Sequence, residues 1–249
     1  MYGPHIDRDE FTSELTCSCC QFYLNGSTGK SWKSIKHWDY PEDFHYYTHC
    51  PVNLNLAKEA NFSAHKTLIK ILKEIKDTPG SAVLHIGTLG TIELVAERIN
   101  SITIPQTQNV KTLLLENSAG QGSYLGRNYR ELRKLFEAID DKSRIGLCID
   151  TQHSFASGLC SFKNEASVDK LFDKLQDIAI VPMIHLNDSE TEFRSLKDRH
   201  APLGTGYIWG TCTESLKYLL ERCTEKNIDL ICETKKFAKD QKIVTSLLT

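Results

Sequence analysis

Several short apolar runs of this 249-residue chain end in a histidine or a carboxylate. Residues at or just after these ends can bind metal ions through imidazole nitrogens or carboxylate oxygens, and they are His49, His85, Glu116, Asp150, His153, His185, Asp198, His200 and Glu233. We therefore predict a metal cluster. Such a cluster could serve either hydrolysis assisted by metal ions or the isomerisation of a sugar.

The apolar runs predict strands that alternate with helices. Runs rich in β-branched and aromatic residues predict strands at Tyr2–Ile6, Cys19–Leu24, Phe44–His49, Ala82–Ile86, Thr112–Glu116, Ile145–Asp150, Val181–Leu186 and Asp229–Glu233. Apolar residues at three- and four-residue spacing predict helices at Leu54–Ile75, Thr91–Ile102, Asn128–Ile139, Val168–Ile178 and Thr213–Cys223. This alternation indicates an α/β fold, and we predict a single (β/α)8 TIM-barrel domain over residues 1–249 with abbreviated N-terminal helices.

In such a barrel the carboxyl ends of the strands form one face, which carries the active site. All the candidate ligands would lie on that face. For one histidine or aspartate alone, helix capping or a hydrogen bond to a buried amide would be the simpler interpretation. Together, and without metal ions, they would crowd ionisable groups at high energetic cost, so the metal cluster is favoured.

Charge and composition limit the functional classes. The formal net charge of −2 provides no global basic field, so contact with nucleic acid would need a local basic patch. The N-terminal residues have no basic and apolar signal-peptide pattern, and no run is long enough to span a bilayer. We therefore expect an intracellular protein, cytoplasmic or nuclear, with no membrane partner.

The cysteines predict reduced thiols. They are nine, an odd number, and several lie within apolar runs, which is not typical of a disulfide framework. Cys17, Cys19 and Cys20 lie close together but lack a second pair at zinc-finger spacing, which favours packed or redox-sensitive thiols. Cys50 directly follows His49, so its side chain should point away from the metal side.

Three motifs carry a family resemblance. They are ENSAGQGS at residues 116–123, CIDTQHSFASG at 148–158, and HLNDS at 185–189 followed by KDRHAPLGTG at 197–206. In this order they closely resemble the motifs of the endonuclease IV family of apurinic/apyrimidinic (AP) endonucleases. The resemblance extends from about Phe44 to Glu233 and is weaker over the N-terminal fifth, where the chain is shorter than the cellular enzymes. Short forms of this family occur in large DNA viruses, and a viral origin would add the virion as a location.

The resemblance implies a trinuclear zinc centre in a barrel. It places His49, His85 and bridging Glu116 at one zinc. It places Glu116, Asp150, His185 and Glu233 at a second, and His153, Asp198 and His200 at a third. The implied activity is hydrolysis of double-stranded DNA on the 5′ side of an abasic site to leave a 3′-hydroxyl, with possible 3′-exonuclease and 3′-phosphatase activities on 3′-blocked ends. The implied enzyme is a monomer.

Roles for further residues follow from the same resemblance. Glu233 would orient the nucleophile or accept its proton, with Glu116 as the second catalytic carboxylate. Asn187 and Asp188 would support the ligands, and the alternative for both is hydrogen bonding within a loop.

Contacts to DNA are implied for a small set of residues. Lys30 and Trp32 lie in a segment that resembles the family's DNA-probing loop, whose alternative is a basic surface loop with a packed tryptophan. Arg199 would face phosphates. Separately from the resemblance, the slightly acidic net charge means that binding of a duplex needs a local basic rim, for which Lys33, Arg127 and Lys197 are further candidates. Val52 stands where the family commonly has an aromatic wedge, and Lys30 where it has arginine, so discrimination of the lesion should be looser.

Two other functions remain as alternatives. A xylose isomerase-like sugar isomerase or epimerase also gathers Glu, Asp and His at strand ends but uses one or two metal ions. A non-catalytic protein that binds damaged DNA would need a broken ligand set, and none is visibly broken.

Overall fold

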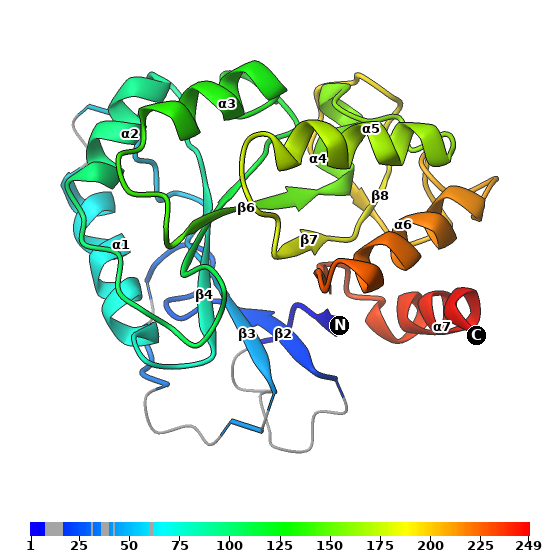
Figure 1. Cartoon of the computed structure of the whole chain (residues 1–249), viewed down its shortest axis with the longest axis horizontal. Helices are drawn as coiled ribbons and strands as arrows, with labels where there is room; N and C mark the ends of the chain where they lie inside the picture. Colours follow the sequence, from blue (N-terminus) through cyan, green and yellow to red (C-terminus); the bar gives the residue numbers. More distant parts are fainter. Residues whose placement is uncertain (8–16, 31, 36–39, 42, 60–61) are drawn as a thin grey trace.

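Eight parallel strands form the centre of the molecule in the computed structural model (Figure 1), which describes residues 1–7, 17–30, 32–35, 40–41, 43–59 and 62–249. The strands are β1 (Tyr2–Pro4), β2 (Cys19–Phe22), β3 (His45–His49), β4 (Gly80–His85), β5 (Leu113–Glu116), β6 (Ile145–Asp150), β7 (Met183–His185) and β10 (Asp229–Cys232). Their order in the sheet is β1-β10-β7-β6-β5-β4-β3-β2. Each predicted strand position is thereby confirmed.

The sheet closes on itself where β1 meets β2. A parallel bridge joins His5, directly after β1, to Gln21 of β2. The backbone N–H of Ile6 donates to the carbonyl oxygen of Gln21 at 2.8 Å. Closure of a parallel sheet with helices outside it is the architecture of a (β/α)8 barrel, so the predicted fold class is confirmed.

Helices cover the outside of the sheet (Figure 1). They are α1 (Phe62–Ile75), α2 (Ile92–Asn100), α3 (Tyr129–Ala138), α4 (Thr151–Ser157), α5 (Glu165–Gln176), α6 (Glu214–Glu225) and α7 (Phe237–Leu248). The side chains of Thr91, Asn128 and Asn164 cap α2, α3 and α5 by accepting a backbone N–H of the first turn. Each cap fixes the residue at which a loop on the active face ends and the helix begins.

The predicted helix Leu54–Ile75 is wrong in its first part, since α1 begins at Phe62. The described residues before it form turns, and the Arg98 guanidinium of α2 donates to the carbonyl oxygens of Leu56, Lys58 and Glu59. These bonds satisfy carbonyls that a helix would otherwise have used.

Three further elements were absent from the predictions: α4, α7, and a hairpin of β8 (Asp188–Ser189) with β9 (His200–Ala201). The prediction of abbreviated N-terminal helices falls partly on residues 8–16, outside the described residues. Between Phe22 and His45, the part that is described contains no helix.

The barrel interior contains one small apolar layer. Its members come one from each of seven strands: Cys19, Tyr47, Val83, Leu114, Cys148, Met183 and Ile231. A larger cluster between the sheet and the helices forms the outer core and includes Cys50. The position of Cys50 in the outer core agrees with the expectation that it points away from the metal side.

Candidate metal centre

The ligand candidates form the next layer above this apolar floor. Side chains in a strand alternate between its two faces, so the residue two positions after an inward-pointing residue also points inward. His49, His85 and Glu116 follow the floor residues Tyr47, Val83 and Leu114 in this way. On the remaining strands the same step leads to Gln21, Asp150, His185 and Glu233. These polar side chains therefore lie together in one layer, between the apolar floor and the active face.

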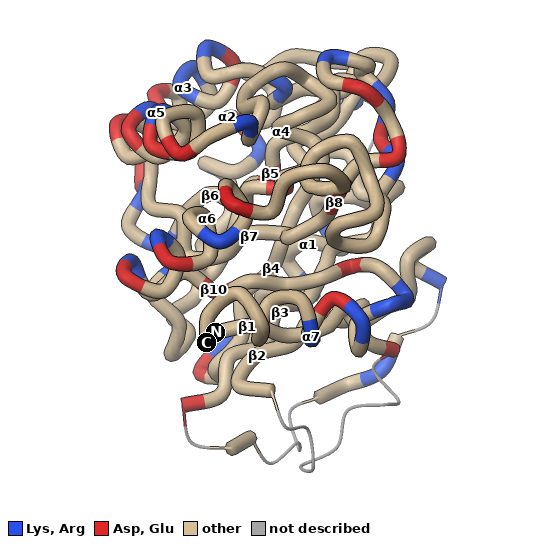
Figure 2. The backbone as a smooth tube through the Cα atoms, turned by 90° about the vertical axis from the view of Figure 1, so that its right-hand side faces the viewer, with Lys and Arg blue, Asp and Glu red and all other residues tan. Residues whose placement is uncertain are grey.

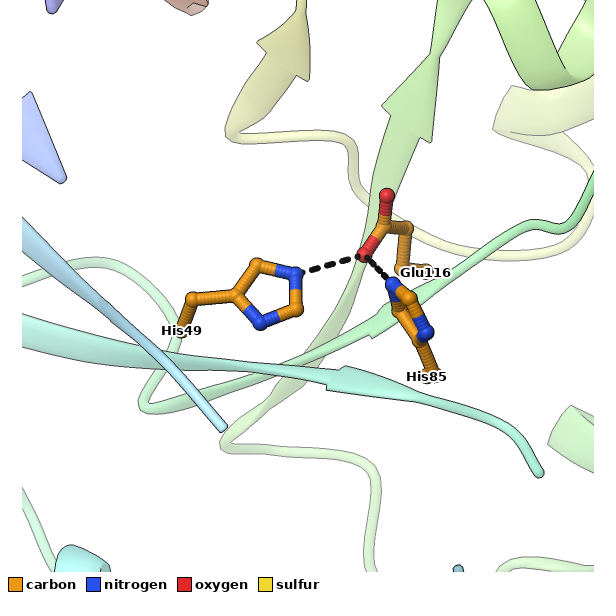
Figure 3. A group of neighbouring side chains, drawn as sticks. All are labelled: His49, His85 and Glu116. Carbon is orange, nitrogen blue, oxygen red and sulfur yellow. Dashed lines mark hydrogen bonds and ion pairs between the residues drawn. The ribbon is translucent and has the colours of Figure 1, made fainter. Parts of the chain in front are cut away.

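One group of potential ligands joins three neighbouring strands. The Nε2 atoms of His49 and His85 lie 3.2 and 3.0 Å from the same carboxylate oxygen of Glu116 (Figure 3). Potential ligand atoms of all three lie within 4.8 Å of one another. The Nδ1–H of His49 donates to the carbonyl oxygen of Cys50 at 2.6 Å, which leaves Nε2 directed at Glu116. Imidazole orientation of this kind is typical of metal ligands.

A second group consists of Asp150, His185 and Glu233, again within 4.8 Å of one another. The Nδ1 atom of His185 lies 3.5 Å from Glu233, 4.0 Å from Asp150 and 3.0 Å from the second oxygen of Glu116. Glu116 therefore contacts histidines of both groups through different oxygens. This is the position that a bridging carboxylate would occupy.

A third group contains Asp150, His153 and His200. Asp198 is close to both histidines, with carboxylate oxygens 3.3 Å from His153 and 3.4 Å from His200. The sequence motif placed Asp198 with these histidines, and the fold brings the three together. Asp150 takes part in two groups, which the sequence did not indicate.

Local structure explains how His153 and His200 reach this position. Asp150 ends β6 and caps α4, accepting the backbone N–H of His153 at 2.8 Å. The His153 Nδ1–H donates to the carbonyl oxygen of Asn117 at 2.9 Å. His200 lies in β9, which pairs with β8. The element missed at the sequence level therefore carries a predicted ligand.

Charges in the centre depend on one another. Burial would raise the pKa of Glu116, but His85 and His185 outweigh burial and hold that pKa well below its usual range. Burial would lower the pKa of His153, whereas Asp150 and Asp198 raise it to about 10. Burial would likewise raise the pKa of Asp198, yet His153 holds it at about 2. The carboxylates are thus ionised at neutral pH and compensated by positive charge.

The donor set fits metal ions. The Nε2 atoms of His153 and His200 are buried, and although Asp198 carboxylate oxygens lie 3.3 and 3.4 Å away, they make no well-aligned hydrogen bond among the described residues. The imidazoles of His49 and His153 are each oriented by a backbone carbonyl oxygen that accepts from Nδ1, and the Glu116 carboxylate near them is buried and ionised. Such nitrogens and oxygens suit zinc, whose charge would replace the compensation now supplied by protonated imidazoles.

Asn187 and Asp188 have different surroundings. The Asn187 side-chain amide donates to Asp150 at 2.7 Å and to Glu233 at 3.1 Å, so it connects two candidate ligands. The buried Asp188 carboxylate accepts the backbone N–H of the next residue, Ser189. It also accepts backbone N–H groups from the loop beyond β9, those of Gly206, Ile208 and Trp209. Of the two expected supporting residues, Asn187 contacts ligands and Asp188 holds the loop beyond β9.

The residues expected to contact DNA lie at the surface. Lys30 and Arg199 are exposed, and the Trp32 ring packs under the ammonium group of Lys70, 3.7 Å from the ring centroid. Val52, 46% exposed, lines a cavity of about 130 Å³ that also includes His85, His153 and Asp198. A cavity wall next to three candidate ligands is a suitable place for a group that senses the substrate. Figure 2 shows basic and acidic residues interspersed on the face it presents.

Three neighbours of the centre were missed at the sequence level. Gln21 contacts both His185 and Glu233, and His5 lies 3.7 Å from Glu233. Cys148 of the floor has its sulfur within 4.8 Å of ligand atoms of Glu116 and His185. None of them ends an apolar run with a charged group, but the two-residue strand period from Cys19 would have found Gln21.

The helices of the described part of the chain include none with the length and apolar character of a membrane span.

Comparison with known proteins identifies relatives over most of the chain. Residues 42–243 match the family model described as xylose isomerase-like TIM barrel. Apurinic-apyrimidinic endonuclease 1 of Plasmodium falciparum is 32% identical over 224 residues, which are 85% of this chain but only 36% of that protein. Probable endonuclease 4 of Halothermothrix orenii is 34% identical over 219 residues, 80% of this chain and 76% of the relative.

A solved structure agrees with this assignment at the level of the fold. Endonuclease IV from Thermus thermophilus superposes with a TM-score of 0.74 at 22% identity, covering 99% of this chain and 98% of that one. The identity and coverage of the Halothermothrix relative, together with the family model, decide the classification. The chain belongs to the endonuclease IV family of xylose isomerase-like TIM barrels.

Proposed function

We propose that this chain is a zinc-dependent AP endonuclease of DNA base excision repair. It would hydrolyse the phosphodiester 5′ to an abasic site in double-stranded DNA and leave a 3′-hydroxyl, with 3′-exonuclease and 3′-phosphatase activities on blocked ends. The observation that carries the proposal is the convergence of four overlapping groups of potential ligands, three of them without a cysteine, in one largely buried centre on the active face of the barrel. The name of the Plasmodium relative, apurinic-apyrimidinic endonuclease 1, supports the same substrate.

The ligands would be distributed over three zinc ions. His49 and His85 would hold the first with Glu116, which would also join the second. The remaining second-site ligands would be Asp150, His185 and Glu233. The third ion would have His153, Asp198 and His200, whose mutual distances of 3.3 and 3.4 Å support this grouping. We propose a monomeric enzyme, because the ligands all come from one chain.

When bound, the zinc ions would supply Lewis-acid activation of water and of the scissile phosphate. The residues of the chain provide the remaining steps. The Glu233 carboxylate is ionised at neutral pH, because His185 holds its pKa low against the effect of burial, so it can accept a hydrogen bond from the attacking water. In this position Glu233 would orient the water or take its proton. Asn187 donates to Glu233 at 3.1 Å and would hold the carboxylate in one orientation.

DNA would lie across the rim that surrounds this centre. We propose that Lys30 and Arg199 neutralise phosphates, as both are exposed. Val52 would face the lesion from the wall of the cavity beside His85. For Trp32, the packing on Lys70 supports the role of an anchor for the loop rather than a direct stacking partner.

An assay of a duplex that contains one abasic analogue tests the proposal. The purified protein should cut one strand immediately 5′ to the analogue, and the new end should be extendable by a polymerase. Prolonged treatment with a strong chelator should abolish cutting, and zinc should restore it. The matched control is Asp173→Asn, a change of an exposed carboxylate on α5 that should cut normally. Cutting that persists without metal, or no cutting with three zinc ions bound, would refute the proposal.

A sugar isomerase is the competing function on this fold. An isomerase of this architecture needs one or two metal ions, whereas His49, His85, His153 and His200 provide ligands beyond those of the Asp150, His185 and Glu233 group. Conversion of ketoses by the metal-loaded protein, with no cleavage of abasic DNA, would favour the isomerase.

A further inference from the structure

Gln21 occupies a ligand-layer position on a strand that supplies no ligand. It lies two residues after the floor residue Cys19, as Glu116 does after Leu114 and His185 after Met183. Its side chain is fully buried. An inward-pointing amide in this layer needs hydrogen-bond partners within the centre, because a buried polar group without a partner is energetically costly.

The Gln21 amide uses its three polar positions on three different groups. Its oxygen lies 2.8 Å from Nε2 of His185. Its nitrogen donates to Glu233 Oε1 at 2.9 Å and lies 2.9 Å from Nδ1 of His5. An amide nitrogen has two hydrogens, so both contacts can form at once. The reverse orientation of the amide would bring its oxygen against the Glu233 carboxylate, so the electrostatics select one orientation.

This orientation dictates the proton position on His185. Because the Gln21 oxygen can only accept, Nε2 of His185 must carry the hydrogen, and Nδ1 is the atom left to bind a metal. Nδ1 is indeed the atom that faces Glu116 at 3.0 Å and Glu233 at 3.5 Å. The same amide holds Glu233 through Oε1, and the other oxygen of Glu233 then faces the ligands and Asn187.

We infer that Gln21 is a positioning residue that fixes the tautomer of His185 and the orientation of Glu233, with His5 holding the Gln21 amide in place. This inference rests on the proposed function only for the identity of the reaction, because the hydrogen-bond geometry is independent of the substrate. Gln21 and His5 also form the bridge that closes the barrel between β2 and β1. The same two residues, Gln21 and His5, thus both close the barrel and hold the candidate ligands His185 and Glu233 in place.

Two substitutions separate the two contacts. Gln21→Met keeps the volume but removes both the acceptor for His185 and the donor to Glu233. Gln21→Glu keeps an acceptor for His185 but places a carboxylate oxygen against Glu233, where like charges repel. Ser81→Ala is the matched control, since Ser81 is buried on β4 and its hydroxyl donates to Lys111 O at 2.7 Å, away from the centre.

The measurements use zinc-loaded full-length protein. In Gln21→Met we expect zinc affinity, measured by competition with a chelator, to fall about 10- to 100-fold, as for other groups that orient metal ligands. The kcat for the abasic duplex should fall over a similar range with KM unchanged, because Gln21 is buried and cannot touch DNA. Ser81→Ala should leave both values unchanged.

Nitrogen-15 NMR of labelled histidines reads the tautomer directly. Wild type should show a ring protonated at Nε2, assigned to His185 by its loss in His185→Gln. Gln21→Glu should retain this signal and Gln21→Met should lose or broaden it. If Gln21→Met does not fold, Gln21→Glu still tests the Glu233 contact through its zinc affinity and kcat.

Different results refute the inference and the proposed function. A folded Gln21→Met protein with the wild-type tautomer signal and zinc affinity would overturn the role of Gln21, even if the enzyme cuts abasic DNA. A wild-type protein that binds zinc but does not cut would overturn the proposed function, while its tautomer and zinc affinity would still test Gln21.

Discussion

The buried carboxylate of Asp188 should control the loop beyond β9 and, through Ser189, the hairpin strand that carries His200. It is fully buried and accepts N–H groups of Ser189, Ile208 and Trp209 at one oxygen and of Gly206 at the other. Ser189 pairs with His200 in the β8–β9 hairpin. Loss of the carboxylate should therefore loosen both the loop at residues 206–209 and the strand that holds His200.

The size of the effect follows from these bonds. In Asp188→Asn, the amide oxygen can replace the carboxylate oxygen that accepts three N–H groups, but the NH2 group must then face the N–H of Gly206. One hydrogen bond to a charged acceptor is lost, so the free energy of unfolding should fall by about 1.5–3 kcal/mol. For a chain of this size, that corresponds to a decrease in Tm of about 3–12 °C. Asp188→Ala should cost more, because it leaves all of these N–H groups without the acceptor.

Thermal unfolding of the zinc-loaded protein and zinc titration would measure the two consequences. Asp188→Asn should show the lower Tm and retain one zinc ion less tightly than the other two. Asp173→Asn on the surface of α5 provides the control, with Tm within about 2 °C of wild type because surface substitutions usually have small effects. Wild-type Tm and equal retention of every zinc ion in Asp188→Asn would refute this account of the loop.

Three further predictions concern the centre and its rim. Elemental analysis of protein purified without chelator should find about three zinc ions per chain, and a value near one, or retained magnesium instead, would contradict the ligand assignment. Glu233→Gln should keep the fold and much of the DNA affinity but lose most cleavage, because an amide cannot accept a proton; near-normal cleavage would show that Glu233 has another role. Binding to duplex DNA should weaken steeply with salt, and Lys30→Ala should reduce the salt slope by about 1, while Val52→Tyr should improve discrimination of abasic from intact duplex. An unchanged slope together with unchanged discrimination would argue against the proposed DNA surface.

The strands and most of the centre were predictable from the sequence for one physical reason. A strand of a barrel is buried on both faces, so it forms an apolar run, and a charged group marks the point at which the run emerges on the active face. His49, His85, Glu116, Asp150 and His185 were found in this way, and each lies in the centre. Asp198 and His200 were found from their motif instead, because their position near His153 depends on a loop and could not follow from strand periodicity.

The errors have equally specific causes. Apolar spacing continues before α1, but the chain there forms turns whose carbonyls are bound by Arg98, a residue far along the sequence. The short helix α4 begins directly after β6 without an intervening loop, so no boundary separates it from the strand. The β8–β9 hairpin has only two residues in each strand, too few for an alternating pattern.

Gln21 and Cys148 show what the search for charged groups overlooks. Both point into the barrel, Gln21 in the ligand layer and Cys148 in the floor beneath Asp150. Burial, despite the opposing effect of His185, raises the pKa of the Cys148 thiol to about 12, and its sulfur lies 3.7 Å from that of Met183. The floor therefore stays neutral and apolar at neutral pH, although Cys148 lies close to two ligands.

A neutral floor has a consequence for the layer above it. The carboxylates of Glu116 and Asp150 cannot be compensated from below, so their charge must be balanced by cations held at the same level or above. Histidines can do this only by taking up protons, which prevents the same nitrogens from binding a metal. Zinc ions would provide the balance while leaving the imidazoles neutral, and a polar amide such as Gln21 can orient an imidazole without adding charge. The apolar floor, the neutral amide and the crowded carboxylates therefore support the proposal that several metal ions bind in this centre.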